Sequence, residues 1–335
     1  MDFRLLVPLL ASFLITLFLL PYWMRKAKQI GLLWDDMNKW KSKKVAGSGG
    51  IIVFFGFVFG VLLFIAYRVF YLKSIDFLIE IFSSLVLISL LAIIGLIDDL
   101  LGWQRGGLSR KSRIIMIAVA SIPLMAINAG RHIVLIPFIG QVDVGILYPL
   151  IFIPIGVVGA TTTFNFLAGF NGLEAGQGIL LLVAASIVAI YTGNSWLAVI
   201  AFCMIAALLA FLFYNKYPAK IFPGDVLTYS VGGLIAVMAI LGNFEKIAVF
   251  FFIPYILEFI LKCRGKLIKQ SFGKPLKDGS LDLRYERIYG LTHLSIYLMK
   301  KMNIKATEKK VTYSIWVFQA LVIIIGFIIF RKGIF

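Results

Sequence analysis

The sequence is poor in the residues that build disulfide frameworks and histidine-rich metal sites. It contains two cysteines, Cys203 and Cys263, and two histidines, His132 and His293, among 335 residues. One cysteine lies inside an apolar run and the other at the end of one, so they form neither a disulfide framework nor a metal cluster. Two histidines are too few for a His-rich zinc or haem site. The chemistry of this chain must therefore come from other side chains.

Acidic residues are also scarce, 16 against 33 Lys and Arg, which gives a formal net charge of +17. What the chain does contain is apolar: 61% of its residues are hydrophobic and 15% are aromatic, and its mean hydropathy is +0.97. Many apolar runs exceed the roughly 18 residues that suggest a bilayer-crossing helix. This composition excludes an ordinary soluble domain and predicts an all-α polytopic membrane protein.

Ten hydrophobic segments predict about ten transmembrane helices. No internal repeat or Pro/Ser-rich linker divides the chain, so we expect residues 1–335 to form one integral membrane domain. Its single long soluble insertion lies at about 263–312. The ten segments are 3–23, 50–70, 77–97, 114–129, 147–164, 176–191, 196–213, 226–242, 246–262 and 313–330.

Positive charge alternates along the polar joints between these segments. The joints at 25–44, 105–113, 214–225 and 262–310 hold 26 of the 33 Lys and Arg residues. By the positive-inside rule these joints face the cytoplasm and both termini lie on the outer or lumenal side. Topology alone accounts for part of this charge, and anionic headgroups and nucleotide-type substrates are found on the same side. We therefore predict no nucleic-acid partner.

Two adjacent carboxylates, Asp98 and Asp99, follow the apolar run 77–97, and Asp225 lies at a similar apolar–polar boundary. A charged side chain near the bilayer centre costs roughly 2.5–3.5 kcal/mol, so such acids usually have a partner. A cationic cluster at 110–113 follows the pair after a short glycine-rich loop. Acids that hold Mg²⁺ and cations that bind phosphate oxygens suit a phosphoryl site. An interfacial salt-bridge cluster is the structural alternative.

Amides and glycines interrupt two apolar runs in the segment 165–177, which includes Asn165, Asn171 and Glu174. Non-helical backbone at membrane depth is tolerated where it lines a cavity, and amide side chains can bind a base edge or a metal. Further on, a Pro-Gly-Asp triplet that ends at Asp225 predicts a helix entry with this aspartate as N-cap. A capping acid can still bind a metal through its other oxygen.

These segments together resemble the polyprenyl-phosphate N-acetylhexosamine-1-phosphate transferases, and most of all their dolichyl-phosphate branch. The resemblance covers most of the chain and includes Asp36-Met-Asn-Lys39, Asp98-Asp99 and 214–225. The run Leu-Ala-Gly-Phe-Asn-Gly-Leu-Glu-Ala-Gly-Gln at 167–177 is similar to the dolichyl type, whereas bacterial relatives have an aspartate-rich version. Ten spans with both ends outside is also the architecture of that family.

The resemblance implies a metal site and a cation that binds lipid phosphate. It makes Asn165 and Asp225 the ligands of Mg²⁺, with Mn²⁺ as the alternative ion, and Arg113 the phosphate-binding residue, with Lys111 as second candidate. The acid pair described above would orient this cation or help to hold the metal. The residues implied to bind substrates are Asp36, Met37, Asn38, Lys39, Gly169, Asn171 and Glu174 for the nucleotide donor, and Val158, Thr162 and Phe166 for the lipid phosphate.

The chain departs from the family at two places. Gly47 falls where eukaryotic members have a glutamate that touches the donor. The Arg-His-Arg or His-rich motif of the last cytoplasmic loop is missing, and Arg264, Lys266, Lys269 and Lys274 stand around its place. We expect one or two of these residues, Lys269 first, to bind the donor instead.

The activity implied by the resemblance is transfer of GlcNAc-1-phosphate from UDP-GlcNAc to dolichyl or another polyprenyl phosphate, with release of UMP, as the first lipid-linked step of N-glycan assembly. Membrane lipids are the remaining partners, and the sequence leaves a homodimer open. Abundant Ile and Lys and the short last loop favour an archaeal cell membrane over the endoplasmic reticulum. The alternatives are an undecaprenyl-phosphate transferase of bacterial type and a transporter, whose polar groups would crowd the bilayer midplane instead of one face.

Overall fold

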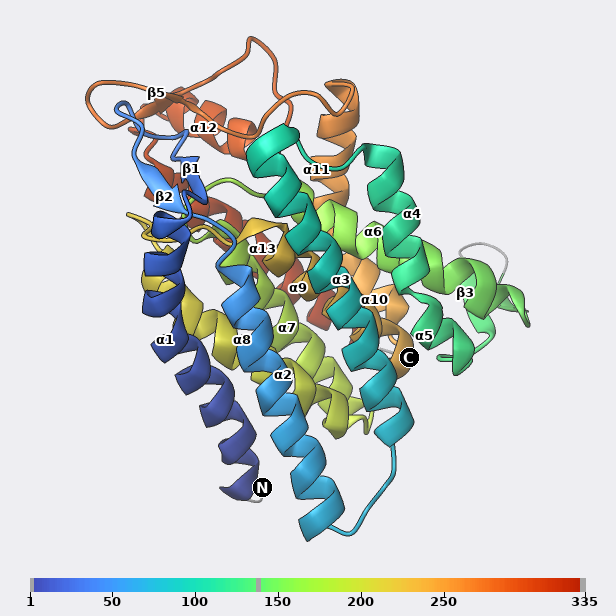
Figure 1. Cartoon of the computed structure of the whole chain (residues 1–335). Coiled ribbons are helices and arrows are strands. Elements are labelled where there is room, and N and C mark those ends of the chain that lie inside the picture. Colours follow the sequence, from blue (N-terminus) through green and yellow to red (C-terminus); the bar gives the residue numbers. More distant parts are fainter. Residues whose placement is uncertain (1–2, 137–139, 332–335) are drawn as a thin grey trace.

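Eight helical segments in the described part of the chain are long and apolar enough to cross a membrane. The computed structural model describes residues 3–136 and 140–331 (Figure 1). The helices are α1 (Leu6–Gln29), α2 (Gly50–Ala66), α3 (Leu78–Arg105), α4 (Arg110–Ala120), α5 (Ile122–Ala126), α6 (Ile153–Phe166), α7 (Leu173–Tyr191), α8 (Ser195–Asn215), α9 (Gly224–Gly242), α10 (Glu245–Phe251), α11 (Ile253–Arg264), α12 (Leu291–Lys301) and α13 (Glu308–Phe330), with short helical turns η1 (Phe3–Leu5), η2 (Tyr67–Tyr71) and η3 (Tyr148–Phe152).

Two of the ten predicted spans are divided. The segment 114–129 is shared between α4 and the short helix α5, and the segment 246–262 between α10 and α11. Pro123 and Pro254 lie in the first turn of α5 and α11. Proline cannot donate the backbone bond that a continuous helix needs, so each helix restarts there. The all-α class is confirmed with eight long candidate spans, and the ten-span topology and the sides of the termini stay predictions.

The bundle is built around α9. In its most apolar window 83% of the residues are buried, against 22% for α1 and α13. Gly232 and Gly233 allow this central position, because a side-chain carbon at Gly232 would lie 2.8 Å from Thr161 Cα, and one at Gly233 would lie 2.2 Å from Leu91. Small residues let membrane helices approach this closely.

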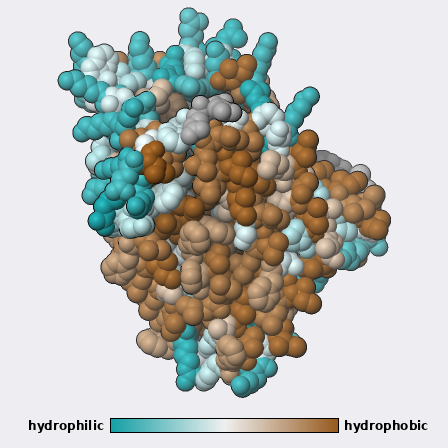
Figure 2. Space-filling model, in the orientation of Figure 1, coloured by the Kyte–Doolittle hydropathy of each residue, from teal (hydrophilic) through white to brown (hydrophobic). Residues whose placement is uncertain are grey.

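The outer surface of the bundle is apolar. Phe18, Ile155 and Val317 are 71%, 63% and 57% exposed, and Figure 2 shows hydrophobic surface over the middle of the molecule with hydrophilic surface at its ends. A contiguous apolar surface of this extent is unfavourable in water and favourable in lipid. The protein is an integral membrane protein with multiple spans.

The polar joints meet at one end of the bundle, at the top of Figure 1, which we call the loop end. Strands β1 (Leu33–Asp35) and β2 (Lys44–Ala46) form an antiparallel hairpin there. Its Ala46 accepts a backbone hydrogen bond of 2.8 Å from Phe222 in the joint before α9. Strands β5 (Lys274–Pro275) and β6 (Leu281–Asp282) pair within the insertion, and β3 (Ile133–Ile136) pairs with β4 (Gly140–Asp143) in the segment between α5 and α6.

Candidate active site

A cavity of about 480 Å³ opens at the loop end between the ends of α3 and α6 and the start of α9. Seven of the predicted site residues line it, together with side chains from the first joint and the insertion. The lining residues are Trp34, Asp35, Asp36, Met37, Ser48, Asp99, Asn165, Ala168, Gly169, Phe170, Glu174, Asn215, Phe222, Pro223, Gly224, Asp225, Thr228, Gln270 and Phe272.

Asp99 caps the N-terminus of α9. Its Oδ1 accepts a hydrogen bond of 2.7 Å from the backbone N–H of Asp225, which satisfies one of the free donors of the first turn. Helix α9 begins at Gly224, and its N-cap is Pro223. The prediction that Asp225 is the N-cap is therefore wrong: this aspartate lies inside the first turn, and its carboxylate is available to the cavity.

Gly224 allows this cap because no side chain fits at its position. Its φ is +71°, and an added Cβ would lie 2.1 Å from Asp99 Oδ2. Left-handed backbone strain alone would lower the free energy of unfolding of Gly224→Ala by about 1–2 kcal/mol. We expect a larger loss, measured as a fall in the thermal melting temperature. Gly279→Ala is the matched control, because Gly279 has φ +78° and a Cβ added there would meet no atom of the described residues within 4 Å. Equal losses in the two variants would contradict the close contact with Asp99.

Asp98 holds Arg113 by two contacts. Its Oδ1 accepts from Arg113 Nη2 at 2.9 Å and its Oδ2 lies 2.5 Å from Nε. The backbone N–H of Leu108 and the hydroxyl of Tyr229 also donate to this carboxylate. Burial would lower the pKa of the Arg113 guanidinium, but the nearby negative charges outweigh burial and raise it. Lys111, in contrast, is exposed.

The cavity has the donor set for a hard cation. The carboxylates of Asp99 and Asp225 and the amide of Asn165 line it. Thr228 Oγ1 lies 3.1 Å from Asn165 Oδ1 and 3.2 Å from the backbone oxygen of Asp225, so it holds the Asn165 amide beside the first turns of α9. Asp99 Oδ2 is buried and has no hydrogen-bond partner within the described residues. Oxygen donors of this kind suit Mg²⁺, although 3–136 and 140–331 hold no metal-binding group of three His, Cys, Asp or Glu.

A buried acid that sequence analysis did not single out, Glu308, organises the opposite wall. Its Oε1 accepts from the backbone N–H of Asn171 at 2.9 Å and from Asn38 Nδ2 at 3.4 Å. Its Oε2 binds the ammonium of Lys39, and Asn171 Nδ2 donates to Asp36 at 3.3 Å. One side chain at the start of α13 therefore contacts three predicted donor-binding residues, and the side chains of two of these also contact Asp36. Its signal in the sequence was a lone acid a few residues before the apolar run 313–330.

We expect Glu308→Gln to raise the KM for the nucleotide donor about 10–100-fold, because hydrogen bonds to a charged group contribute about 1.5–3 kcal/mol. The KM for the lipid acceptor should stay unchanged. Steady-state kinetics with each substrate varied in turn measure both constants. Glu286→Gln, at an exposed acid of the insertion, is the control. Equal increases in both KM values would contradict a local role on the donor side.

The loop 167–172 is fixed by its own polar groups and by the insertion. Glu174 Oε1 accepts from the N–H of Gly169 at 2.8 Å, and Asn38 Nδ2 donates to the carbonyl of Gly169 at 2.9 Å. The ring of Phe272 covers Gly169, where an added Cβ would lie 2.7 Å from Phe272. This glycine has φ +101°, so both its conformation and its contact exclude a larger residue.

Lys269 does not line the cavity. Its ammonium lies over the rings of Tyr285 and Tyr289, at 4.9 and 5.9 Å from their centroids. The insertion contributes Gln270 and Phe272 to the lining instead, and Arg284 Nη1 donates to Gln270 Oε1 at 2.5 Å. None of the four basic residues expected to replace the missing motif is part of this cavity lining, so that expectation stays a prediction.

The indole of Trp34 fills the space beside Gly47. A side-chain carbon at Gly47 would lie 2.4 Å from Trp34 Cδ1, and Trp34 itself lines the cavity. A residue larger than glycine therefore does not fit beside this indole, and Trp34 provides the wall at the place where the resemblance puts a glutamate in eukaryotic members.

One face of α6 stays partly open. Val158, Thr162 and Phe166 follow one another at helical spacing and are half-buried, and a carbon added at Gly159 would meet no atom within 4 Å. Phe166 stacks on Phe259 of α11 at 6.2 Å. This face ends at Asn165 and the cavity, so an extended apolar chain lying along α6 would reach it.

The sequence of this chain is similar to transferases that act on lipid phosphates. The family described as glycosyl transferase family 4 matches residues 81–243. A protein of Saccharolobus solfataricus, named "Putative UDP-N-acetylglucosamine--dolichyl-phosphate N-acetylglucosaminephosphotransferase", is 35% identical over 328 residues, which cover 97% of this chain and 96% of the relative. The chain belongs to glycosyl transferase family 4.

Two further similar proteins share less identity with this chain. The UDP-N-acetylglucosamine–dolichyl-phosphate N-acetylglucosaminephosphotransferase of Dictyostelium discoideum is 28% identical over 94% of this chain and 85% of its own length. The phospho-N-acetylmuramoyl-pentapeptide-transferase of Lacticaseibacillus paracasei is 27% identical over 76% of this chain and 81% of its own. The resemblance seen in the sequence is confirmed: this family member is a membrane enzyme that transfers a sugar 1-phosphate to a lipid phosphate acceptor.

Proposed function

We propose that the protein transfers GlcNAc-1-phosphate from UDP-GlcNAc to dolichyl phosphate, with release of UMP and formation of GlcNAc-PP-dolichol. The single observation that supports this proposal most is the cavity in which Asp99, Asn165 and Asp225 face the donor-side residues Asp36 and Gly169. The names of the archaeal and Dictyostelium relatives supply the sugar and the lipid. The reaction would be the first lipid-linked step of N-glycan assembly, and we infer an archaeal cell membrane as its place.

In the proposed reaction an oxygen of the lipid phosphate attacks the β-phosphorus of the donor, and the bond from this phosphorus to the bridging oxygen breaks. UMP takes the bonding electrons as it leaves. The second pKa of a phosphate monoester is about 6, so the nucleophile needs no strong base at neutral pH. The contacts of Asp98 agree with a reaction that needs no base, because both of its carboxylate oxygens are already bound by Arg113 and other donors. We therefore assign Asp98 to the positioning of Arg113.

The site would lower the barrier mainly by position and charge. Arg113 would bind the lipid phosphate at the end of the open face of α6. Mg²⁺, held by Asn165 and Asp225 beside the free Oδ2 of Asp99, would neutralise the negative charge of the diphosphate. Asn171, Asn38 and their neighbours would hold the nucleoside, since their amides are fixed in place by the network around Glu308.

A radiolabelled transfer assay with purified protein tests the proposal. We expect transfer from UDP-GlcNAc to dolichyl phosphate in Mg²⁺, and loss of transfer in a chelator. The bacterial-type alternative, supported by the relative from Lacticaseibacillus paracasei, predicts a preference for undecaprenyl phosphate and UDP-MurNAc-pentapeptide. Such a preference would refute the dolichyl assignment.

A further inference from the structure

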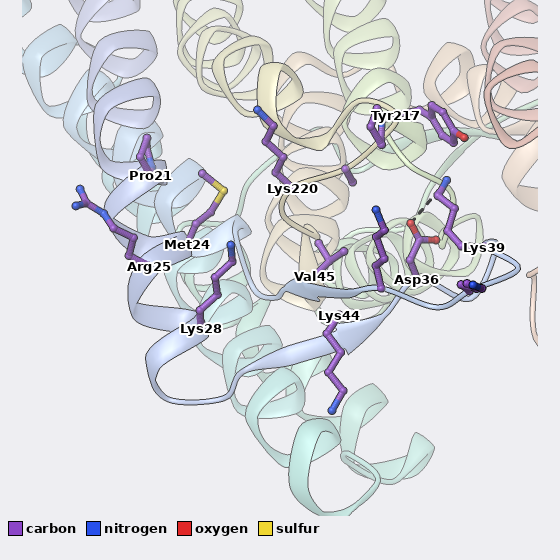
Figure 3. A pocket seen from close by; sticks show the side chains of 14 residues that line it. Pro21, Met24, Arg25, Lys28, Asp36, Lys39, Lys44, Val45, Tyr217 and Lys220 are labelled. Carbon is purple, nitrogen blue, oxygen red and sulfur yellow. Dashed lines mark ion pairs between the residues drawn. The ribbon is translucent and has the colours of Figure 1, made fainter.

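A second cavity, of about 670 Å³, lies at the loop end beside the first span (Figure 3). It is bounded by the last turns of α1, by the β1–β2 hairpin and by the joint between α8 and α9. The residues that line it are Pro21, Met24, Arg25, Lys28, Asp36, Lys39, Lys41, Lys43, Lys44, Val45, Tyr217, Pro218, Ala219 and Lys220.

The lining is strongly positive. Seven of its 14 residues are Lys or Arg, and one is acidic. Lys39 has carboxylate partners, Asp36 at 3.7 Å and Glu308. None of the other six cations forms a salt bridge with any residue in 3–136 or 140–331, the part of the chain that the structure describes. Unpaired charges of one sign around a concave surface focus the field and attract an anion. Topology explains positive charge at this end, but not its convergence on one cavity.

The position of the cavity at the ends of two membrane spans indicates a lipid ligand. Pro21 and Met24 belong to α1, a candidate membrane span that continues to Gln29. Tyr22, in the same turn, is 56% exposed, and an exposed aromatic beside basic residues is typical of the headgroup region. The opposite wall begins at Tyr217, two residues after the last residue of the span α8. The cavity therefore opens where two spans leave the bilayer, at the level of lipid phosphates.

The cavity is separate from the proposed reaction site. Two predicted donor-binding residues, Asp36 and Lys39, line one edge of it, where Lys39 is paired with Asp36 and Glu308. None of the residues predicted to bind the lipid acceptor or the metal lines it. In Figure 3 the ammonium of Lys39 is directed toward Asp36 and the ring of Tyr217, whereas Arg25, Lys28 and Lys44 extend from the α1 end and the hairpin. We propose that this cavity binds the phosphate headgroup of an anionic membrane lipid that is not a substrate.

Lipid-dependent thermal stability tests this proposal without any substrate. Purified protein in detergent is titrated with phosphatidylglycerol or with phosphatidylcholine of the same acyl chains. We expect the melting temperature to rise with phosphatidylglycerol and to stay unchanged with phosphatidylcholine. The triple variant Lys28→Gln/Lys44→Gln/Lys220→Gln should bind this lipid about 100-fold more weakly, since each basic residue near the surface adds to the attraction. Glycerol 3-phosphate, the free form of the same anion, should leave the melting temperature unchanged.

The matched control is Lys266→Gln/Lys301→Gln/Lys310→Gln, which removes three exposed lysines from the same end of the molecule and should keep wild-type affinity. Equal weakening in both triple variants would overturn the proposal in favour of diffuse attraction. An equal response to glycerol 3-phosphate, or no difference between the two phospholipids, would also overturn it. Because no UDP-sugar is present, failure here is distinct from failure of the transfer assay.

Discussion

Asp225→Asn is expected to lower Mg²⁺-dependent UMP release about 10³-fold. The substitution keeps the shape of the side chain in the first turn of α9 but removes the charge that would bind the metal. Loss of about 4 kcal/mol of charge stabilisation corresponds to a rate loss of this size. UMP release by the purified variant is measured over a range of Mg²⁺ concentrations, with Asn165→Ala in parallel.

The control is Asp278→Asn, because Asp278 is an exposed aspartate of the insertion at the same end of the bundle. It should keep wild-type turnover. A melting temperature close to that of the wild type would show that Asp225→Asn is folded. If this folded variant released UMP at the wild-type rate, the metal assignment would be wrong.

Arg113→Gln is expected to lower kcat/KM for the lipid phosphate about 10²–10³-fold, the usual effect of removing one group that stabilises developing charge. Lys111→Gln should change it little, because Lys111 is exposed whereas the guanidinium of Arg113 is held against Asp98. The measurement is the rate of transfer at varied acceptor concentration and saturating donor.

Arg110→Gln serves as the matched control for this pair. Arg110 lies in the same turn of α4, and its guanidinium donates to the carbonyls of Lys266 and Leu267 in the insertion. A larger loss in Lys111→Gln than in Arg113→Gln would transfer the phosphate-binding role to Lys111. Equal small losses of kcat/KM in all three variants would show that α4 does not bind the lipid phosphate.

Hydropathy was sufficient to predict the class of fold, because each span is an uninterrupted apolar run. It did not predict where a run breaks. Pro123 and Pro254 lie within apolar sequence, and hydropathy alone does not distinguish a kinked span from two shorter helices. The grouping of basic joints was a better guide: contacts such as Phe222 to Ala46 and Arg110 to Lys266 bring these joints to the same end.

Predictions made from neighbouring residues also missed contacts between residues that are distant along the chain. The N-cap prediction for Asp225 used its immediate neighbours, whereas the acceptor at this helix start is Asp99, 126 residues earlier. Glu308 was missed for the same reason, since its contacts with Asn171 and Lys39 span 137 and 269 residues. The polar segments singled out in the sequence do meet at one cavity: several residues of 34–48, 165–174 and 215–228 line it, together with Asp99 at the end of α3. The roles of these residues stay predictions.

Glu308 joins residues from the two ends of the chain to its central segment. The acids and amide proposed to handle the phosphates lie within residues 81–243, the segment matched by the family. Asn38, Lys39 and Glu308 come from either flank of that segment. On the proposed assignment, substitutions at the two ends of the coding sequence would change contacts to the nucleotide donor while the acids and amide of the central segment stay in place.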